Sequence, residues 1–345
     1  MRPWSHTYAG RLEARELTSE ALRDNPLGDS ATRPLYVYVP PGYDDDPGQR
    51  YPAVYVLQGY LGALPSWNYP ANTFRATYPE MADELFSSGG APPCLVVFVD
   101  AWTSLGGSQF VDSPGTGRYH TYLCEDVVGF VDATYRTLDR PAHRAVQGKS
   151  SGGFGAMVTA MLRPDLFGGF ASHAGDAGFE HCFLPEIAAA YRALRDRYDR
   201  SYEAFFEDFR SRPALSKGPD FALLMVYAMA ACFSSDADGT VHLPFDVATG
   251  RLDEAAWARW LAWDPVRMAA LRPDSLRSLR AIWVDAGRSD DAQLDLGAEA
   301  FVDELRRLGV DEVRFELFDG THRGIEHRYP LALAYLAERI SPSAQ

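Results

Sequence analysis

The sequence predicts an α/β protein built on a mostly parallel, doubly wound sheet. The chain has 345 residues, a length that suits one large domain with an insertion. Several short runs are apolar on both faces, and helical patterns alternate with them. Strands of this kind need helices above and below them, and alternation of strand with helix is typical of parallel sheets. We therefore expect helices on both faces of one central sheet.

The first third of the chain contains three of the predicted strands. Residues 35–39 are β-branched or aromatic and stop at Pro40, a residue that interrupts strands. Residues 53–57 and 94–99 are continuous apolar runs, and such runs indicate strands that are buried on both sides.

Later segments continue the alternation. Apolar residues recur at helical spacing over residues 127–138 and 294–308, and Gly309 follows the second helix as a cap. A further helix is predicted at 154–162. Short strands are predicted at residues 144–147, 169–173, 281–285 and 313–318.

One region breaks this pattern. Residues 176–279 contain no convincing strand, only helical segments rich in Tyr, Phe, Trp and Ala. We interpret the region as a helical insertion that caps the mouth of the sheet. The chain would then consist of an α/β core, residues 1–175 and 280–345, and a cap, residues 176–279.

Composition excludes several classes of protein. Hydrophobic residues make up 46% and charged residues 23%, which is typical of a globular chain rather than a disordered one. The 33 basic and 47 acidic residues give a formal net charge of −14. Because an acidic surface repels phosphate backbones and no basic stripe is present, we expect no nucleic-acid partner.

We expect a cytoplasmic protein. Residues 1–30 lack the apolar core of a signal peptide, and the longest apolar stretch, residues 221–233, is too short to cross a bilayer, so no membrane partner is expected. Four scattered cysteines without C-x-x-C spacing argue against a zinc site or a disulfide framework, although a Cys182–Cys232 bridge stays open. A homo-oligomer also stays open.

The sharpest signal for chemistry is the segment Gly148-Lys149-Ser150-Ser151-Gly152, between a predicted strand and a predicted helix. The pattern G-x-S-x-G makes a tight strand-to-helix turn that strains the serine backbone and lifts its hydroxyl above the sheet. Ser150 is therefore the candidate nucleophile. The same residues could end a phosphate-binding loop, but that motif needs a glycine where His143 stands.

A serine nucleophile needs a base and an orienting acid, in the chain order Ser, Asp or Glu, His. His322 follows the last predicted strand, at the carboxyl edge of the sheet where catalytic loops gather, and is the predicted base. Asp285, Asp290 and Asp291 compete for the role of acid. Asp290 is favoured because a loop residue has the reach to a histidine on the next loop, and Asp291 is second.

Two backbone amides are predicted to form an oxyanion hole. One belongs to Ser151, and the other belongs to Tyr60, where Gly59 lets the backbone turn its amides into the pocket. Each such donor lowers the barrier by roughly 3–4 kcal/mol. Four residues on nearby loops are candidate substrate-binding residues: Trp102, Gln109, Tyr119 and His173.

Residues 147–156, with Gly287-Arg288-Ser289-Asp290 and Asp319-Gly320-Thr321-His322, resemble the putative-esterase family of α/β-hydrolases. Esterase D, the S-formylglutathione hydrolases, the enterochelin esterases and the mycolyltransferases belong to this group. The resemblance covers roughly residues 33–340. It implies an α/β-hydrolase fold in which Ser150, Asp290 and His322 are nucleophile, acid and base, and in which the amides of Tyr60 and Ser151 form the oxyanion hole. The chain departs from many relatives at Ser151, where they carry a methionine.

The residues and the resemblance together predict a serine carboxylic-ester hydrolase that acts through an acyl-enzyme on a small or medium ester. No metal or organic cofactor is expected, and a metal site made of His173, Asp176 and His181 is not favoured because nothing fixes their geometry. Two alternatives stay open: an acyltransferase that passes the acyl group to an alcohol or sugar, and a non-catalytic binding protein on a hydrolase scaffold.

Overall fold

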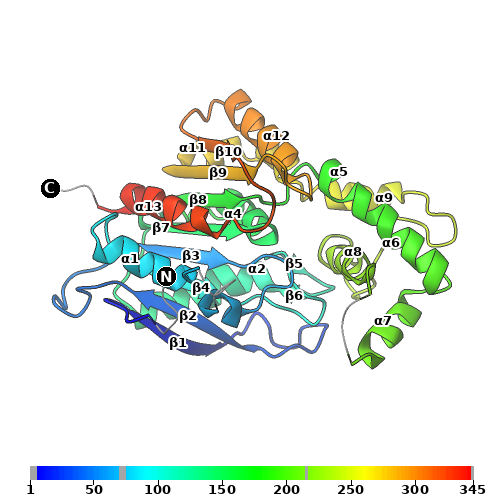
Figure 1. The fold of residues 1–345 in the computed structure, drawn as a ribbon, viewed down its shortest axis with the longest axis horizontal. Helices are drawn as coiled ribbons and strands as arrows, with labels where there is room; N and C mark the ends of the chain where they lie inside the picture. Colours follow the sequence, from blue (N-terminus) through cyan, green and yellow to red (C-terminus); the bar gives the residue numbers. More distant parts are fainter. Residues whose placement is uncertain (1–5, 70–74, 214–216, 343–345) are drawn as a thin grey trace.

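A mixed sheet of eight strands forms the centre of the protein in a computed structural model that describes residues 6–69, 75–213 and 217–342 (Figure 1). The strand order is β1-β2-β4-β3-β7-β8-β9-β10. β2 pairs antiparallel with β1 and β4, and all other neighbours are parallel. The strands are β1 (Arg11–Thr18), β2 (Thr32–Val39), β3 (Ala53–Leu57), β4 (Leu95–Val99), β7 (Arg144–Lys149), β8 (Gly169–His173), β9 (Ala281–Gly287) and β10 (Arg314–Phe318). The predicted, mostly parallel sheet is confirmed.

Each strand predicted from the sequence is present, and β3 and β8 have the predicted ends. The sequence analysis missed β1. This strand lies at the edge of the sheet, and its exposed face carries alternating charges that resemble a solvated segment more than a strand. A two-residue ribbon, β5 (Asp112–Ser113) with β6 (Gly117–Arg118), forms a separate small sheet.

Helices cover both faces of the sheet. α1 (Tyr78–Ser87) and α13 (Tyr329–Ile340) share one apolar cluster with Val54 and Val56, whereas α3 (Val128–Thr134), α4 (Ser151–Leu162) and α12 (Leu294–Arg307) share another with Tyr55 and Leu57. Successive strand residues point to opposite faces, so one continuous apolar strand serves two cores. The helix predicted over 127–138 ends earlier than expected, because Tyr135 adopts an extended backbone with φ −120° and ψ 159°. A π-helical segment, η2 (Tyr122–Val127), leads directly into α3.

The region predicted to be a cap is helical. Figure 1 shows α6, α7, α8 and α9 grouped beyond one end of the sheet, next to β5 and β6. The side chain of Ser113 donates a hydrogen bond to the carbonyl of Ala231 in α8 at 2.6 Å, which ties this group to the core. The helices are α5 (Phe179–Cys182), α6 (Leu184–Arg197), α7 (Tyr202–Ser211), α8 (Asp220–Phe233), α9 (Glu254–Leu261), α10 (Pro265–Leu271) and α11 (Pro273–Ser278). α10 and α11 pack against α4, so the end of the predicted cap adjoins the core.

All four cysteines are buried and unpaired, so Cys182 and Cys232 do not form a bridge. Within residues 6–69, 75–213 and 217–342, no helix combines the length and the apolar character that a bilayer-crossing segment requires.

Candidate active site

The turn between β7 and α4 has the geometry that the sequence pattern predicts. Ser150 adopts φ 56° and ψ −126°, a strained backbone conformation for a residue with a side chain. Its N–H donates to the carbonyl of His173 at 3.0 Å. A Cβ at Gly148 would overlap the carbonyl of Gly152, and a Cβ at Gly152 would overlap the carbonyl of Leu57. Only glycines fit at both positions, and β7 runs straight into the turn without a phosphate-binding loop.

His322 lies against Asp290, the acid favoured by the sequence analysis. His322 Nδ1 is 2.9 Å from Asp290 Oδ2, and the N–H of Ala292 donates to the other carboxylate oxygen at 2.8 Å. The Asp290 side chain is completely buried, whereas that of His322 is 20% exposed. Because an ionised carboxylate only accepts hydrogen bonds, Nδ1 carries the hydrogen and Nε2 presents its lone pair.

The loops that carry these two residues touch each other directly. The N–H of Ser289 donates to the carbonyl of Gly320 at 3.0 Å. A Cβ at Gly287 would overlap the same carbonyl, so the glycine allows the close approach. This contact explains how a residue after β9 meets a residue after β10.

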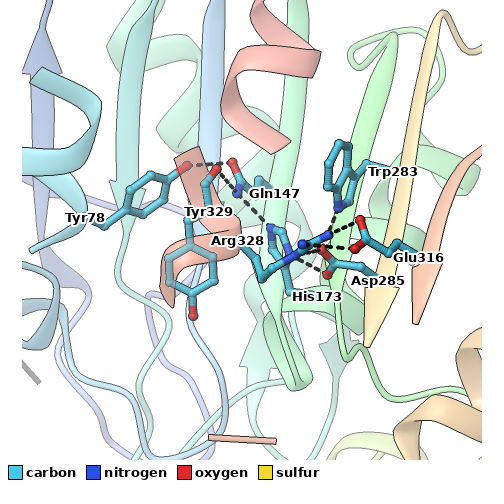
Figure 2. A network of polar contacts seen from close by, with 8 residues as sticks. All are labelled: Tyr78, Gln147, His173, Trp283, Asp285, Glu316, Arg328 and Tyr329. Atoms are coloured by element: carbon cyan, nitrogen blue, oxygen red, sulfur yellow. Dashed lines mark hydrogen bonds and ion pairs between the residues drawn. The ribbon is translucent and has the colours of Figure 1, made fainter. Parts of the chain in front are cut away.

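Asp285, a competing candidate for the acid, belongs to a different histidine (Figure 2). His173 Nδ1 lies 2.7 Å from Asp285 Oδ1, while Trp283 Nε1 and Arg328 Nε each donate to Oδ2 at 2.9 Å. Arg328 also donates to Glu316 at 2.7 Å. Burial alone would raise the pKa of Asp285, but His173, Trp283 and Arg328 bring it below its ordinary value.

The second ring nitrogen of His173 is also occupied. Gln147 Nε2 lies 2.9 Å from His173 Nε2 and donates to the carbonyl of Tyr329 at 3.2 Å, and the hydroxyl of Tyr78 donates to Gln147 Oε1 at 2.7 Å (Figure 2). A completely buried imidazole whose two nitrogens already have partners cannot form a hydrogen bond with a substrate. The interpretation of His173 as a substrate-binding residue is therefore wrong.

The other predicted substrate-binding residues have different surroundings. Tyr119 is completely buried and its hydroxyl faces the carbonyl of Trp102 at 3.5 Å, so it too cannot line an open pocket. Trp102 is 41% exposed. Gln109 is 1% exposed, and its Nε2 donates to Ser151 Oγ at 2.8 Å, directly beside the elbow.

The two amides predicted as an oxyanion hole lie on neighbouring loops. A Cβ at Gly59 would come 3.4 Å from Ser150 Cβ, so the loop after β3 borders the nucleophile. Within the described part of the chain, the N–H groups of Tyr60 and Ser151 have no hydrogen-bond acceptor. The Tyr60 ring is held by its hydroxyl, which donates to the carbonyl of Leu105 at 2.8 Å.

Asp176, which the sequence indicated only as part of an unfavoured metal site, is a further polar residue at the elbow. Its Oδ1 lies 3.5 Å from Ser150 Oγ and its Oδ2 accepts from Ser151 Oγ at 3.1 Å. Burial raises the pKa of this carboxyl to about 6, although the nearby His322 and the serine hydroxyls lower it in part. The available signal was its place shortly after β8, at the sheet edge where β7 also ends.

A cavity of about 370 Å³ opens beside Gly59. Its walls are largely aromatic or polar and include Gln58, Trp67, Tyr78, Glu326 and Tyr329. The cavity provides room for part of a small molecule close to the elbow. Among the described residues, no group of three or more His, Cys, Asp or Glu side chains could hold a metal ion.

A parallel sheet in which a central strand ends at a serine elbow, with an acid and a histidine on later loops, is the architecture of the α/β-hydrolases, and this protein has that fold. Residues 30–323 match the family described as "Putative esterase", and the chain belongs to it. The predicted family and fold class are both confirmed.

Two solved structures resemble the protein over nearly its whole length. A ferulic acid esterase has a TM-score of 0.63 at 19% identity, covering 97% of this chain and 100% of that one. The fluorophosphonate-binding serine hydrolase F of Staphylococcus aureus has a TM-score of 0.57 at 14% identity, covering 96% and 99%. At these identities the likeness concerns the fold.

A curated relative is similar over a shorter stretch. An uncharacterized protein of Corynebacterium glutamicum is 26% identical over 185 residues, which is 50% of this chain. The matched stretch spans 40% of that protein.

Proposed function

We propose that the protein is a serine carboxylic-ester hydrolase that works through an acyl-enzyme, with Ser150 as nucleophile, His322 as base and Asp290 as the orienting acid. The observation that carries the proposal is the His322–Asp290 pair, at 2.9 Å, on loops at the sheet edge where the strained Ser150 elbow also lies. An imidazole oriented by a buried carboxylate is the group that a serine hydroxyl needs in order to react.

In the first half of the reaction, Ser150 Oγ attacks the ester carbonyl carbon while His322 Nε2 takes the hydroxyl proton. Negative charge moves onto the carbonyl oxygen, where the amides of Tyr60 and Ser151 donate to it. The C–O bond to the alcohol then breaks, and the alkoxide leaves with the proton from His322. Asp290 stabilises the imidazolium while it exists.

In the second half, water attacks the acyl carbon and gives a proton to His322. The bond to Ser150 Oγ breaks, the proton returns to the serine, and the carboxylic acid leaves. An alcohol in place of water would make the protein an acyltransferase. The cavity of about 370 Å³ beside Gly59 supports an ester with a small or medium group on that side.

The proposal is tested by a fluorophosphonate probe and a panel of p-nitrophenyl esters. We expect covalent labelling and ester hydrolysis by the wild-type protein, and neither with Ser150→Ala. Ser151→Ala is the matched control, because the neighbouring hydroxyl is removed while labelling at position 150 persists. A wild-type protein that is not labelled and hydrolyses no ester would overturn the proposal in favour of a binding protein.

A second experiment separates hydrolase from acyltransferase. The acyl-enzyme is formed from a p-nitrophenyl ester in the presence of increasing glycerol or glucose. Free acid as the main product supports the hydrolase. If the main product is the new ester, the acyltransferase is correct.

A further inference from the structure

Asp176 holds a buried carboxyl group against the nucleophile. The residue is 7% exposed, and in the part of the chain that the structure describes no Lys, Arg or His forms an ion pair with it, although His322 lies near enough to lower its pKa in part. Its hydrogen-bond donors are the hydroxyls of Ser150, at 3.5 Å, and Ser151, at 3.1 Å. Buried carboxylates ordinarily have a cation or several amides as partners, so this one is unusually dependent on two neutral hydroxyls.

Close packing of glycines builds this contact into the fold. A Cβ at Gly153 would come 2.7 Å from the Cα of Gly175, and a Cβ at Gly175 would overlap Ser172 Oγ. The loop after β8 therefore rests directly on the first turn of α4. Asp264 fixes the other end of the loop by accepting from the N–H groups of Gly178, at 3.0 Å, and Phe179, at 3.2 Å.

A short relay fixes one of the two carboxyl oxygens. Gln109 Nε2 donates a hydrogen bond to Ser151 Oγ at 2.8 Å, and the Ser151 hydroxyl in turn donates a hydrogen bond to Asp176 Oδ2. Because a hydroxyl has one hydrogen, Ser151 has none left for another acceptor. Asp176 Oδ1 depends on Ser150 alone.

The Ser150 hydrogen turns from Asp176 Oδ1 to His322 Nε2 when the serine attacks, so acylation removes that donor. The proton of Ser150 goes to His322 and leaves with the alcohol, so in the acyl-enzyme Oγ is an ester oxygen without hydrogen. Asp176 Oδ1 then faces a second acceptor, an arrangement that a buried ionised group does not tolerate without a new donor. The alcohol has departed by this stage and the water that attacks has yet to arrive, so a donor that is present throughout the reaction belongs to the acyl group.

We propose that Asp176 is a specificity-determining residue that accepts a hydrogen bond from a hydroxyl or amino group on the acyl part of the substrate, one or two carbons from the scissile carbonyl. The proposal rests on the proposed function. Covalent bond lengths put such a substituent within roughly 3–4 Å of Oγ, and Oδ1 is 3.5 Å from the same atom, so a substituent directed toward Asp176 comes within hydrogen-bonding reach of Oδ1. The preferred substrates would be esters of hydroxy acids or amino acids.

The ionisation of Asp176 supports this substrate class. The groups that act on the carboxyl are Ser150, Ser151, His322 and Asp290, and the thiol of Cys182 also lies near it. Burial raises its pKa to about 6, so at pH 8 the carboxyl is ionised and acts only as an acceptor.

The test compares kcat/KM at pH 8 for the p-nitrophenyl esters of butyric, 2-hydroxybutyric and 3-hydroxybutyric acid, each divided by its rate of hydrolysis by hydroxide. We expect the wild-type protein to favour one hydroxy ester over butyrate by about tenfold or more. Asp176→Ala should bring that ratio close to one. Asp264→Asn is the matched control: it loosens the same loop but leaves the Asp176 carboxyl in place, so the ratio should persist.

Two results would overturn the inference: a wild-type protein without preference for either hydroxy ester, or an Asp176→Ala variant that keeps the preference. Asp176→Val has a similar volume and no hydrogen-bond acceptor, and it provides the measurement if the alanine variant does not fold. Fluorophosphonate labelling in the same samples keeps the two claims apart. Labelled protein that hydrolyses butyrate without hydroxyl preference refutes this inference alone, whereas unlabelled, inactive wild-type protein refutes the proposed function.

Discussion

His173 Nδ1 lies 2.7 Å from Asp285 Oδ1, in a completely buried pair next to the strand that leads to Ser150. The same edge of the sheet carries a second histidine–aspartate pair, His322 with Asp290, at 2.9 Å. The two pairs differ in whether the second ring nitrogen of the histidine has a hydrogen-bond partner. Gln147 contacts the second nitrogen of His173, whereas the second nitrogen of His322 has no described partner. The two carboxylates should therefore respond differently to the same substitution.

Asp290→Asn should lower kcat by about 10⁴-fold, because an amide in place of the carboxylate favours the wrong tautomer of His322 and no longer stabilises its imidazolium. Stability should change little, since the neutral side chain keeps its shape. Steady-state kinetics with a p-nitrophenyl ester measure the effect. Near wild-type turnover would move the role of acid to Asp291.

Asp285→Asn should act on folding. The substitution leaves the buried guanidinium of Arg328 without one of its two carboxylates, and breaking such a pair costs about 3 kcal/mol. The pKa of Asp285 is lowered in the folded protein, so its stabilising effect is present above the unfolded pKa of about 3.9 and is lost as the pH falls through the folded value. Denaturant titrations measure the free energy of unfolding. This free energy should be much lower for the variant than for the wild type at pH 7, and the two values should lie closer together at pH 3. Equal stabilities at pH 7 would contradict this.

Asp176→Asn should stabilise the protein at neutral pH. The folded-state pKa of about 6 lies above the unfolded value of about 3.9, so the carboxyl favours folding fully below about pH 4 and loses that effect as the pH rises through 6. At pH 7.5 the ionised group costs about 2–3 kcal/mol, which the amide avoids. Thermal unfolding should therefore give the variant a higher melting temperature than the wild type at pH 7.5, and no increase at pH 4. A variant less stable than wild type at pH 7.5 would show that the serine hydrogen bonds outweigh the cost of burial.

Gly152→Ala should destabilise the elbow by about 3 kcal/mol or more, because its Cβ would overlap the carbonyl of Leu57 and come 2.7 Å from that of Gln58. Gly129→Ala is the control, since Gly129 lies exposed in α3 and no atom stands within 4 Å of the new Cβ. That control should gain about 0.5–1 kcal/mol through helix propensity. Chemical denaturation measures both. Comparable effects at the two positions would argue against the close contact at Gly152.

Thiol titration should count four free cysteines in the unfolded protein without reductant. In the native protein the thiols should react slowly, because burial raises the pKa of Cys124 and of Cys232 to about 12 and excludes the reagent. An Ellman assay with and without guanidinium measures both. A count of two in denaturant would mean that a bridge forms in solution.

Local sequence patterns were sufficient for the main features of the fold. The apolar run of β3 has a sharp end at Gln58, and the structure keeps that end. The elbow was recognisable from the local spacing of its glycines, of which Gly148 is forced by the nearby carbonyl of Gly152 and Gly152 by the distant carbonyl of Leu57. The pairing of His322 with Asp290 followed from chain order, since successive strands of a parallel sheet end at the same edge.

Features set by side-chain direction or by distant packing were not predictable in this way. His173 is the last residue of β8, and the alternation of the strand turns its side chain toward α13, where its ring lies 5.1 Å from that of Tyr329. The position of a residue at a strand end does not reveal this direction. Asp176 reaches the nucleophile because Gly175 touches Gly153, a contact between separate segments that no local pattern encodes.

Arg328 stands immediately before α13 and joins Asp285 of β9 to Glu316 of β10. The segment that bears His322 leaves the sheet at Phe318 and returns to it at this arginine. Its two ends are thus fixed by residues outside the segment, while Gly320 and His322 hold its middle against the loop after β9. Evolution, or a protein engineer, could exchange the exposed residues Arg323 and Gly324 and retune the surroundings of the imidazole while the scaffold beneath stays intact.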